Sequence, residues 1–340
     1  MKKPVVAITI GDAAGIGPEV ALKALLKSDI RTKSCYVLIG SLAVWQHTAK
    51  QLNFPKSLVP VDSPEAAMKL KNSIPVLESS GLKLSDFDLG MPNQATGRAA
   101  GLAIEKAVEL ALEWRIDAVV TAPLQKEALN RAGFHFPGHT EMLKSLTDVA
   151  EVVMLMHSAK LSTALVTTHE ALTRVPALLS VDKIVRTIEL TNAFFQKLGN
   201  QKPRISVAAL NPHAGECGLF GNEEAEIIAP AIQKARHAGI DVSGPLPSDT
   251  IYYHAVKGSF DCVVSMYHDQ GLIPFKLIAF DEGVNVTLGL PFPRTSPDHG
   301  TAADIAGKNC ARAESMIQAL LLAYRLCENK QNIQNLKDQK

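Results

Sequence analysis

Short apolar runs typical of buried strands alternate with helix-like segments along most of this 340-residue chain. A strand pattern at Val5–Ile10 precedes a helix pattern at Pro18–Leu26, and Cys35–Ile39 is followed by a helix pattern at Leu42–Leu52. Strands that alternate with helices form a parallel sheet covered by helices. The sequence therefore predicts an α/β fold with a largely parallel sheet.

The alternation continues towards the C-terminus, where further strands and helices are predicted. The strands are 118–121, 151–156, 162–167, 204–209 and 262–266, and the helices are 95–114, 181–198 and 223–238. Residues 53–95 contain several prolines and little periodicity, so we expect a peripheral excursion there.

Length and composition limit the class of protein. A chain of 340 residues is longer than one hydrophobic core usually serves, so two lobes with a cleft are expected. The net charge of +1 gives no general attraction to nucleic acid or to a membrane. Five cysteines without CxxC spacing favour a reducing compartment, and the N-terminus has no signal-peptide pattern, so the cytoplasm is expected.

Three histidines stand in separate segments that follow strand-like runs. They are His169 in Thr167-Thr168-His169, His213 in Asn211-Pro212-His213-Ala214-Gly215, and His268 in Met266-Tyr267-His268-Asp269. Ligands of open α/β sheets gather where strands end, so the three imidazoles could converge on one open, zinc-type site. Alternatively, each histidine alone could simply hydrogen-bond a loop carbonyl.

Two further segments could bind an anion. Gly11–Gly17 lies between a strand and a helix, as phosphate-binding loops do, but its spacing differs from the dinucleotide fingerprint and a tight packing turn would explain it equally. In Gly138-His139-Thr140-Glu141, Thr140 could be a helix N-cap with neighbouring amides open to an anion.

The last third of the chain carries cations beside Gly- and Pro-rich turns. Lys276 and Arg294 flank such a turn, which indicates a clamp for a small phosphate or carboxylate, with solvated surface charge as the alternative. Residues 298–307 are rich in small side chains that would let a flat ring lie against the backbone; close packing at a helix start is equally compatible with them.

Together and in this order, these segments resemble those of the 4-hydroxythreonine-4-phosphate dehydrogenase family of vitamin B6 synthesis. The resemblance runs from about Val5 to Ala323 and includes Gly244–Thr250 and Val284–Pro291. It implies a two-lobed fold like that of isocitrate and isopropylmalate dehydrogenases, with an active site in the cleft between lobes. The first lobe would comprise residues 1–130 and 290–340, and the second 131–289 with the metal site and dimer contacts.

The resemblance also implies roles for individual residues. His169, His213 and His268 match metal ligands, one of them supplied across the interface of a homodimer with shared active sites. The substrate-binding positions are matched by His139, Thr140, Lys276, Asn285 and Arg294. The cofactor loop, on the adenine side, is matched by His299, Gly300, Thr301, Ala302 and Asp304. The glycine-rich segment would be an active-site loop.

The implied reaction depends on NAD or NADP and on a divalent metal such as Zn, Mg or Co. It oxidises 4-phosphohydroxy-L-threonine to 2-amino-3-oxo-4-phosphooxybutanoate, which loses CO2 to give 3-amino-2-oxopropyl phosphate. Asp249 or Asp269 would be the proton acceptor or orienting carboxylate. The family usually has proline where this chain has Ala13, and an apolar branched residue where it has Pro293; neither change removes a ligand.

Other activities remain open from the sequence. Within the family they are dehydrogenases of erythronate or threonate 4-phosphate, or of a ring dihydrodiol. Outside it they are a zinc-dependent hydrolase, which would need no nicotinamide, and a binding protein with a structural metal, whose site would be closed by a fourth protein ligand.

Overall fold

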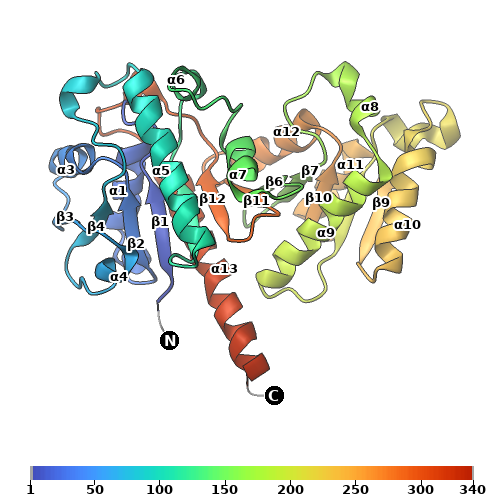
Figure 1. Cartoon of the computed structure of the whole chain (residues 1–340). Helices are drawn as coiled ribbons and strands as arrows, with labels where there is room; N and C mark the ends of the chain where they lie inside the picture. The colour runs from blue at the N-terminus through green and yellow to red at the C-terminus, as the bar shows by residue number, and fades with distance from the viewer. Residues whose placement is uncertain (1–2, 339–340) are drawn as a thin grey trace. The chain divides into compact units, whose positions relative to one another are not determined.

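The computed structural model describes residues 3–338, and of residue 28 and residues 330–338 it describes only the backbone. The chain divides into two compact units (Figure 1). Unit 1 is Met1–Glu151 with Leu290–Lys340, and unit 2 is Val152–Gly289. The predicted boundary after residue 130 was wrong, because residues 131–151 belong to unit 1, where α7 (His139–Thr147) contacts α5 (Gln94–Leu112).

Unit 1 contains a parallel set of strands in the order β3-β4-β2-β1-β5-β12. These strands are β1 Val5–Thr9, β2 Cys35–Ile39, β3 Leu58–Pro60, β4 Ile74–Leu77, β5 Ala118–Thr121 and β12 Arg294–Pro297. Strands β1, β2 and β5 match their predicted positions closely. The expected excursion at 53–95 was wrong in part, because β3 and β4 extend the sheet within it.

Helices surround these strands in unit 1. They are α1 Gly17–Leu26, α2 Ser28–Arg31, α3 Leu42–Gln51, α4 Pro64–Ala67, α5, α6 Lys126–Arg131, α7 and α13 Glu314–Asp338, with 3-10 turns η1 Leu84–Asp86 and η5 Ala303–Ile305. Small residues let α5 pack closely: a Cβ at Gly97 would lie 2.0 Å from the carbonyl oxygen of Ala128, and one at Gly101 would collide with Phe134. This packing is the reason the segment around α6 stays with unit 1.

Unit 2 contains strands in the order β11-β6-β7-β10-β8-β9. They are β6 Val153–His157, β7 Ser162–Leu165, β8 Ile205–Ala208, β9 Val242–Leu246, β10 Cys262–Ser265 and β11 Val284–Leu288. The pairs β7-β10, β10-β8 and β8-β9 are parallel, whereas β6 runs antiparallel to both β11 and β7. The α/β class is confirmed, with one antiparallel strand in this unit.

The helices of unit 2 are α8 Val175–Leu178, α9 Val181–Lys197, α10 Ala229–His237, α11 Ser248–Val256 and α12 His268–Ala279, with short turns η2 Leu172–Arg174, η3 Pro212–Gly218 and η4 Glu224–Ile228. Two of these helices, α9 and α10, lie close to predicted helices, whereas α8, α11 and α12 were not predicted. The predicted helix 223–238 is divided, because its first part, η4, is a single π-helical turn.

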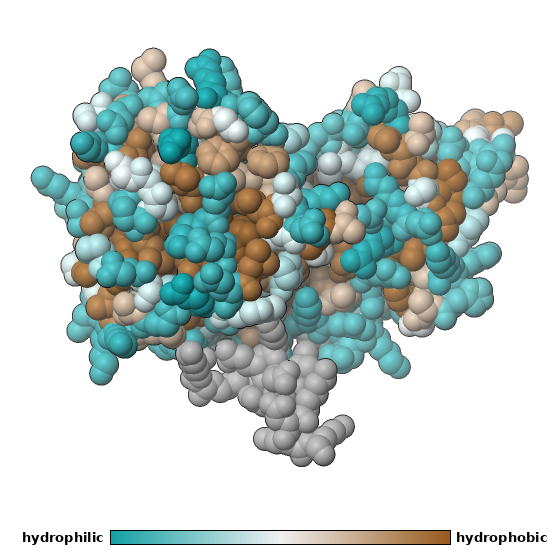
Figure 2. Space-filling view, in the orientation of Figure 1, coloured by the Kyte–Doolittle hydropathy of each residue, from teal (hydrophilic) through white to brown (hydrophobic). Residues whose placement is uncertain are grey.

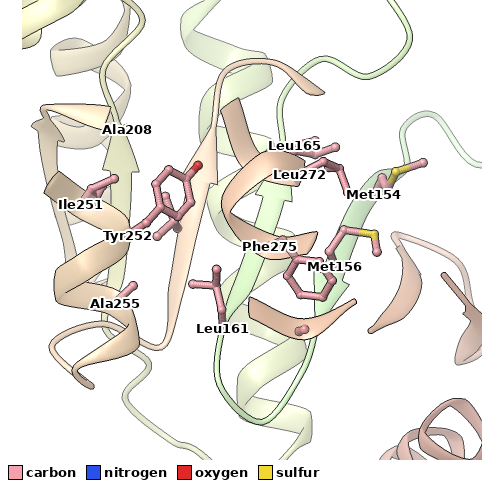
Figure 3. Close-up of a cluster of buried hydrophobic side chains, with 12 residues drawn as sticks. Met154, Met156, Leu161, Leu165, Ala208, Ile251, Tyr252, Ala255, Leu272 and Phe275 are labelled. Atoms are coloured by element: carbon pink, nitrogen blue, oxygen red, sulfur yellow. The ribbon is translucent and has the colours of Figure 1, made fainter. Parts of the chain in front are cut away.

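A buried cluster fixes α11 and α12 on the strands of unit 2 (Figure 3). Leu272 and Phe275 of α12 pack with Met154 and Met156 of β6, and Ile251 anchors α11. Full burial of such side chains contributes about 1.5–3 kcal/mol each. The core therefore holds the first turn of α12, which begins with His268, in a fixed position.

The surface is consistent with a globular protein. The face in Figure 2 mixes hydrophilic and hydrophobic residues. Within residues 3–338, none of the helices combines the length and apolar character that crossing a bilayer requires.

Candidate active site

Two of the three predicted metal-binding histidines lie together in unit 2. The ring centroids of His169 and His268 are 5.6 Å apart, whereas the ring of His213 lies beside Phe220, at 6.1 Å. Among the described residues, no group of three or more His, Cys, Asp or Glu side chains is arranged to hold a metal ion. One chain therefore brings together a pair of imidazoles and not the complete predicted trio.

Asp269 orients one member of this imidazole pair. Its Oδ1 lies 2.7 Å from Nδ1 of His268. A carboxylate at one ring nitrogen fixes the imidazole tautomer and leaves the other nitrogen, Nε2, available as a ligand. The pair fits a divalent cation in its chemistry, and a further ligand would have to come from another segment or subunit.

A buried glutamine connects three segments that carry predicted site residues. Nε2 of Gln270 donates to the carbonyl of Ala209 at 2.6 Å and to Oγ of Ser248 at 2.9 Å, and its Oε1 accepts from the amide of Met266 at 2.6 Å. These bonds join the ends of β8 and β10 to the start of α11. These hydrogen bonds fix the residues just before His268 and just before Asp249. The Asp249 side chain is exposed in the first turn of α11.

The segment around His213 is held by Glu224. Its Oε1 accepts from the amides of Leu210 and Asn211 at 2.8 and 2.7 Å, and its Oε2 from the side-chain amide of Asn211 at 3.0 Å. His213 itself is exposed and has a left-handed backbone, with φ of 51°. Sequence reasoning missed Glu224, because nothing in its local pattern marks it as a partner of a loop thirteen residues away.

Unit 2 also contains two of the predicted substrate-binding residues, and they lie on different elements. Lys276 is exposed on α12, with Nζ 6.0 Å from the centroid of the Phe280 ring. Asn285 is on β11, and its Oδ1 is buried without a hydrogen-bond partner among the described residues. A buried amide oxygen in this state is suited to a ligand that donates a hydrogen bond.

In unit 1, the buried Arg294 and the half-buried His139 form a positively charged site. Arg294, 2% exposed at the start of β12, donates from Nη2 to Oγ1 of Thr121 at 2.5 Å. Burial lowers the pKa of Arg294 to about 9, and the charge of Glu141 acts in the opposite direction. At neutral pH the guanidinium therefore remains largely protonated, and a bound anion would stabilise it.

His139 complements this cation without adding charge. Burial lowers its pKa well below 6.5, and the charges of Arg294 and Lys126 lower it further. Its Nε2 is buried and has no hydrogen-bond partner among the described residues. A neutral imidazole beside a buried guanidinium provides a hydrogen bond and a positive charge for one small anion.

The predicted N-cap at Thr140 was wrong. Helix α7 begins at His139, and Gly138 occupies the N-cap position without a side-chain cap, so Thr140 lies in the first turn. Thr140 is half-buried there.

The glycine-rich loop and the predicted cofactor segment lie against each other in unit 1. The amide of Ile16 donates to the carbonyl of Thr301 at 2.9 Å, and a Cβ at Gly15 would lie only 2.8 Å from that oxygen. Gly11 has φ of 67°, and a Cβ there would lie 2.3 Å from the carbonyl oxygen of Pro123. Both glycines are thus required for close backbone approach.

This loop also carries a buried carboxyl group that sequence reasoning did not single out. Asp12 is fully buried; its Oδ1 accepts from the amide of Ala14 at 2.9 Å, and Oδ2 has no hydrogen-bond partner among the described residues. Burial raises the pKa of Asp12, while the bond from Ala14 and the Thr96 hydroxyl lower it. The only sequence feature that could have indicated Asp12 is its position in the glycine-rich loop, directly after Gly11.

Within the predicted cofactor segment, His299 is half-buried. Its Nδ1 lies 3.0 Å from the carbonyl oxygen of Gly300, its Nε2 is buried without a partner among the described residues, and burial lowers its pKa. Ala302 has a left-handed backbone and precedes η5, in which Asp304 is exposed. A neutral imidazole and small side chains leave room for a flat polar ring.

A family model described as pyridoxal phosphate biosynthetic protein PdxA matches residues 32–323. The chain belongs to this family. It is 46% identical to a 4-hydroxythreonine-4-phosphate dehydrogenase of Trichlorobacter lovleyi, over 96% of this chain and 99% of that protein. It is 43% identical to a D-threonate 4-phosphate dehydrogenase of Salmonella typhimurium, over 96% and 100%. The protein is thus a PdxA-family oxidoreductase.

A solved structure gives the same result for the fold. The crystal structure of a 4-hydroxythreonine-4-phosphate dehydrogenase from Burkholderia phymatum matches with a TM-score of 0.83 and 42% identity, covering 96% of this chain and 99% of that one. The resemblance stated from the motifs is confirmed at the level of the family.

Proposed function

We propose that the protein oxidises 4-phosphohydroxy-L-threonine with NAD or NADP, in a reaction that requires a divalent metal. The observation that carries the proposal is the buried guanidinium of Arg294 beside the half-buried His139, whose buried Nε2 has no partner among the described residues; together they suit one small anion such as the substrate phosphate. The family membership supplies the class of reaction.

Residues of both units would bind the substrate. Arg294, His139 and Thr140 hold the phosphate, and Lys276 and Asn285 contribute to substrate binding. Fixing the phosphate places the reacting carbon, so that binding energy lowers the barrier to the chemical step.

His169, His213 and His268 would hold the divalent cation, which when bound lowers the pKa of the substrate 3-hydroxyl. Asp249 or Asp269 would accept the hydroxyl proton, and a bound nicotinamide cofactor would supply the acceptor for the hydride from C3. The resulting 3-oxo acid then breaks its C1–C2 bond, releasing CO2, and C2 of the remaining enol takes up a proton. The products are 3-amino-2-oxopropyl phosphate, CO2 and reduced nicotinamide.

The cofactor would lie against the segment from His299 to Asp304. The small residues of this segment and the neutral ring of His299 support a flat, polar adenine rather than a charged group.

A homodimer would complete the metal site. Helix α12 exposes Ile273, Leu277 and Phe280 at 66%, 86% and 65%, on one side of the helix that begins with His268. Exposed apolar side chains at this spacing support a protein contact beside the imidazoles. Such a contact could bring His213 of one subunit to the other subunit's pair.

D-Threonate 4-phosphate is the second candidate substrate, because a relative named for that activity is nearly as similar to this chain as one named for hydroxythreonine phosphate. The two acids differ at C2, where one carries an amine and the other a hydroxyl.

The deciding experiment compares the two acids, and erythronate 4-phosphate, as substrates of metal-stripped enzyme supplied with NAD or NADP and with Zn, Mn, Co or Mg. We expect reduced nicotinamide and CO2 in equal amounts, with hydroxythreonine phosphate giving the highest kcat/KM. A higher kcat/KM for threonate 4-phosphate would replace the first candidate by the second. Turnover of phosphorylated substrates without nicotinamide would overturn both in favour of a hydrolase.

A further inference from the structure

A cavity of about 650 Å³ lies in unit 1 at the amino ends of its strands. Its lining includes Lys3 before β1, Cys35 at the start of β2, and Ile74 at the start of β4. The glycine loop follows the opposite, carboxyl end of β1, and Thr121 is the last residue of β5. Because the strands are parallel, the cavity is at the other end of the sheet from these candidate active-site groups.

The cavity is strongly positive. Lys3, Arg31, Lys56 and Lys71 line it, and no Asp or Glu of the described part of the chain is among its lining residues. One guanidinium nitrogen of Arg31 is bound to the carbonyl of Leu25 at 2.9 Å, which limits the freedom of that side chain. Four basic side chains around one cavity, in a chain of net charge +1, are a local concentration of positive charge that favours an anion.

Two buried hydroxyl groups add polar contacts to the lining. Ser34 is 4% exposed and Tyr36 is 3% exposed, and neither hydroxyl has a hydrogen-bond partner among the described residues. Burial raises the pKa of Tyr36 to about 12, with the Ser34 hydroxyl acting in the opposite direction and Asp29 raising it further. The phenol therefore stays protonated and can donate to an anion.

The remaining wall is apolar. Met68, Leu70 and Pro75 line it, and the volume is within the usual range of about 300–1,000 Å³ for small-molecule sites. We propose that this cavity is a second binding site, for a small phosphomonoester that carries an apolar or aromatic group. The cations and hydroxyls bind the phosphate, and the apolar wall covers the rest of the molecule.

Cys35 offers a readout that is specific to this cavity. Its thiol is half-buried in the lining, whereas Cys310, in the same unit, is exposed and is not part of the lining. The full-length protein is alkylated with iodoacetamide in the presence of phenyl phosphate, inorganic phosphate or phenol. Mass spectrometry of the labelled peptides then gives a rate for each cysteine.

We expect phenyl phosphate to slow labelling of Cys35 at least about fivefold and to leave Cys310 unchanged. Inorganic phosphate should protect more weakly, and phenol should not protect. Lys71→Ala should raise the half-protecting concentration by about tenfold, the usual order for loss of one charge-assisted contact. The matched control is Lys69→Ala, which removes an exposed lysine of the same segment that does not line the cavity.

Tyr36→Phe separates binding from folding. Because the phenol hydroxyl has no hydrogen-bond partner among the described residues, its removal should weaken protection while the melting temperature changes little. The proposal is overturned if phenyl phosphate does not protect Cys35, or if Lys69→Ala weakens protection as much as Lys71→Ala. Equal protection by inorganic phosphate would overturn the apolar part of the ligand.

Discussion

The anion site of unit 1 and the imidazole pair of unit 2 differ in how complete they are within one chain. Arg294 is buried and bonded to Thr121, and the neighbouring His139 is held neutral. His169 is exposed, His268 is partly exposed, and His213 contacts Phe220 instead of the pair. A buried charge has to be stabilised by partners within the same chain. Exposed imidazoles are solvated by water, so they need no such partners before a metal or a second subunit binds.

The largest expected effect tests whether the imidazole site is shared between subunits. His169→Ala and His213→Ala should each reduce kcat at least about a thousandfold and lower metal content with it, while the melting temperature changes little because both side chains are exposed. Mixing the two inactive variants and allowing the subunits to exchange should restore activity to roughly a quarter of the wild-type value, since half of the dimers are mixed and each holds one intact site. No recovery in mixed dimers would mean that one chain supplies all three ligands.

The next effect tests the anion site. Arg294→Lys keeps a positive charge and loses the bidentate guanidinium, so kcat/KM for the phosphorylated substrate should fall by about a hundredfold. Metal content should stay unchanged, because the residue belongs to the other unit. Lys308→Ala, which changes an exposed cation of unit 1, serves as the control. A variant with normal kcat/KM would remove Arg294 from the substrate site.

A smaller effect concerns the carboxylate beside His268. Asp269→Asn keeps the shape of the side chain and removes the charge that orients the imidazole, so metal affinity should fall by about 10–100-fold. Excess metal should restore most of kcat. A loss of kcat that saturating metal does not restore would instead make Asp269 the proton acceptor.

The dimer contact can be tested on α12. Leu277→Lys places a charge in the middle of the exposed apolar stripe, so sedimentation should show monomer, and activity should fall with it. The control is Val256→Lys, at an exposed apolar residue at the end of α11 in unit 2. A Leu277→Lys protein that remains dimeric with full activity would show that this face is not the contact.

The smallest effect is a pH dependence of stability. Because the pKa of His139 lies well below 6.5 in the folded protein, the unfolded chain takes up a proton first as the pH falls through 6.5. This residue therefore lowers stability below pH 6.5, by at most about 1.4 kcal/mol per pH unit. His139→Asn should flatten the fall in melting temperature between that pH and the folded-state pKa, and the exposed His135→Asn should not. An unchanged slope in the first variant would show that His139 is protonated in the native state.

The alternation of strand and helix patterns predicted seven of the twelve described strands, and the helices α1, α3, α5, α9 and α10, because a buried strand and an amphipathic helix each leave a local signal. Strands β3, β4, β9, β11 and β12 were missed, since they are short and proline or polar residues interrupt their apolar runs. The boundary of unit 1 was misplaced, because only the contact between α5 and residues 126–147 shows to which unit they belong.

The site was predicted at the level of residue types and motifs. Sequence marked His139 and Arg294 but did not show that burial makes one neutral and leaves the other a compensated cation. It gave no sign of Glu224 or of the bonds of Gln270, because their partners are distant along the chain.

The sequence by itself determined the fold class and the family, and it predicted which residues carry the chemistry, because periodicity and motifs are local properties. Only the tertiary structure decided which imidazoles pair, which charges are buried and where a second cavity lies. These depend on burial and on contacts between residues far apart in the chain, and a local pattern contains neither.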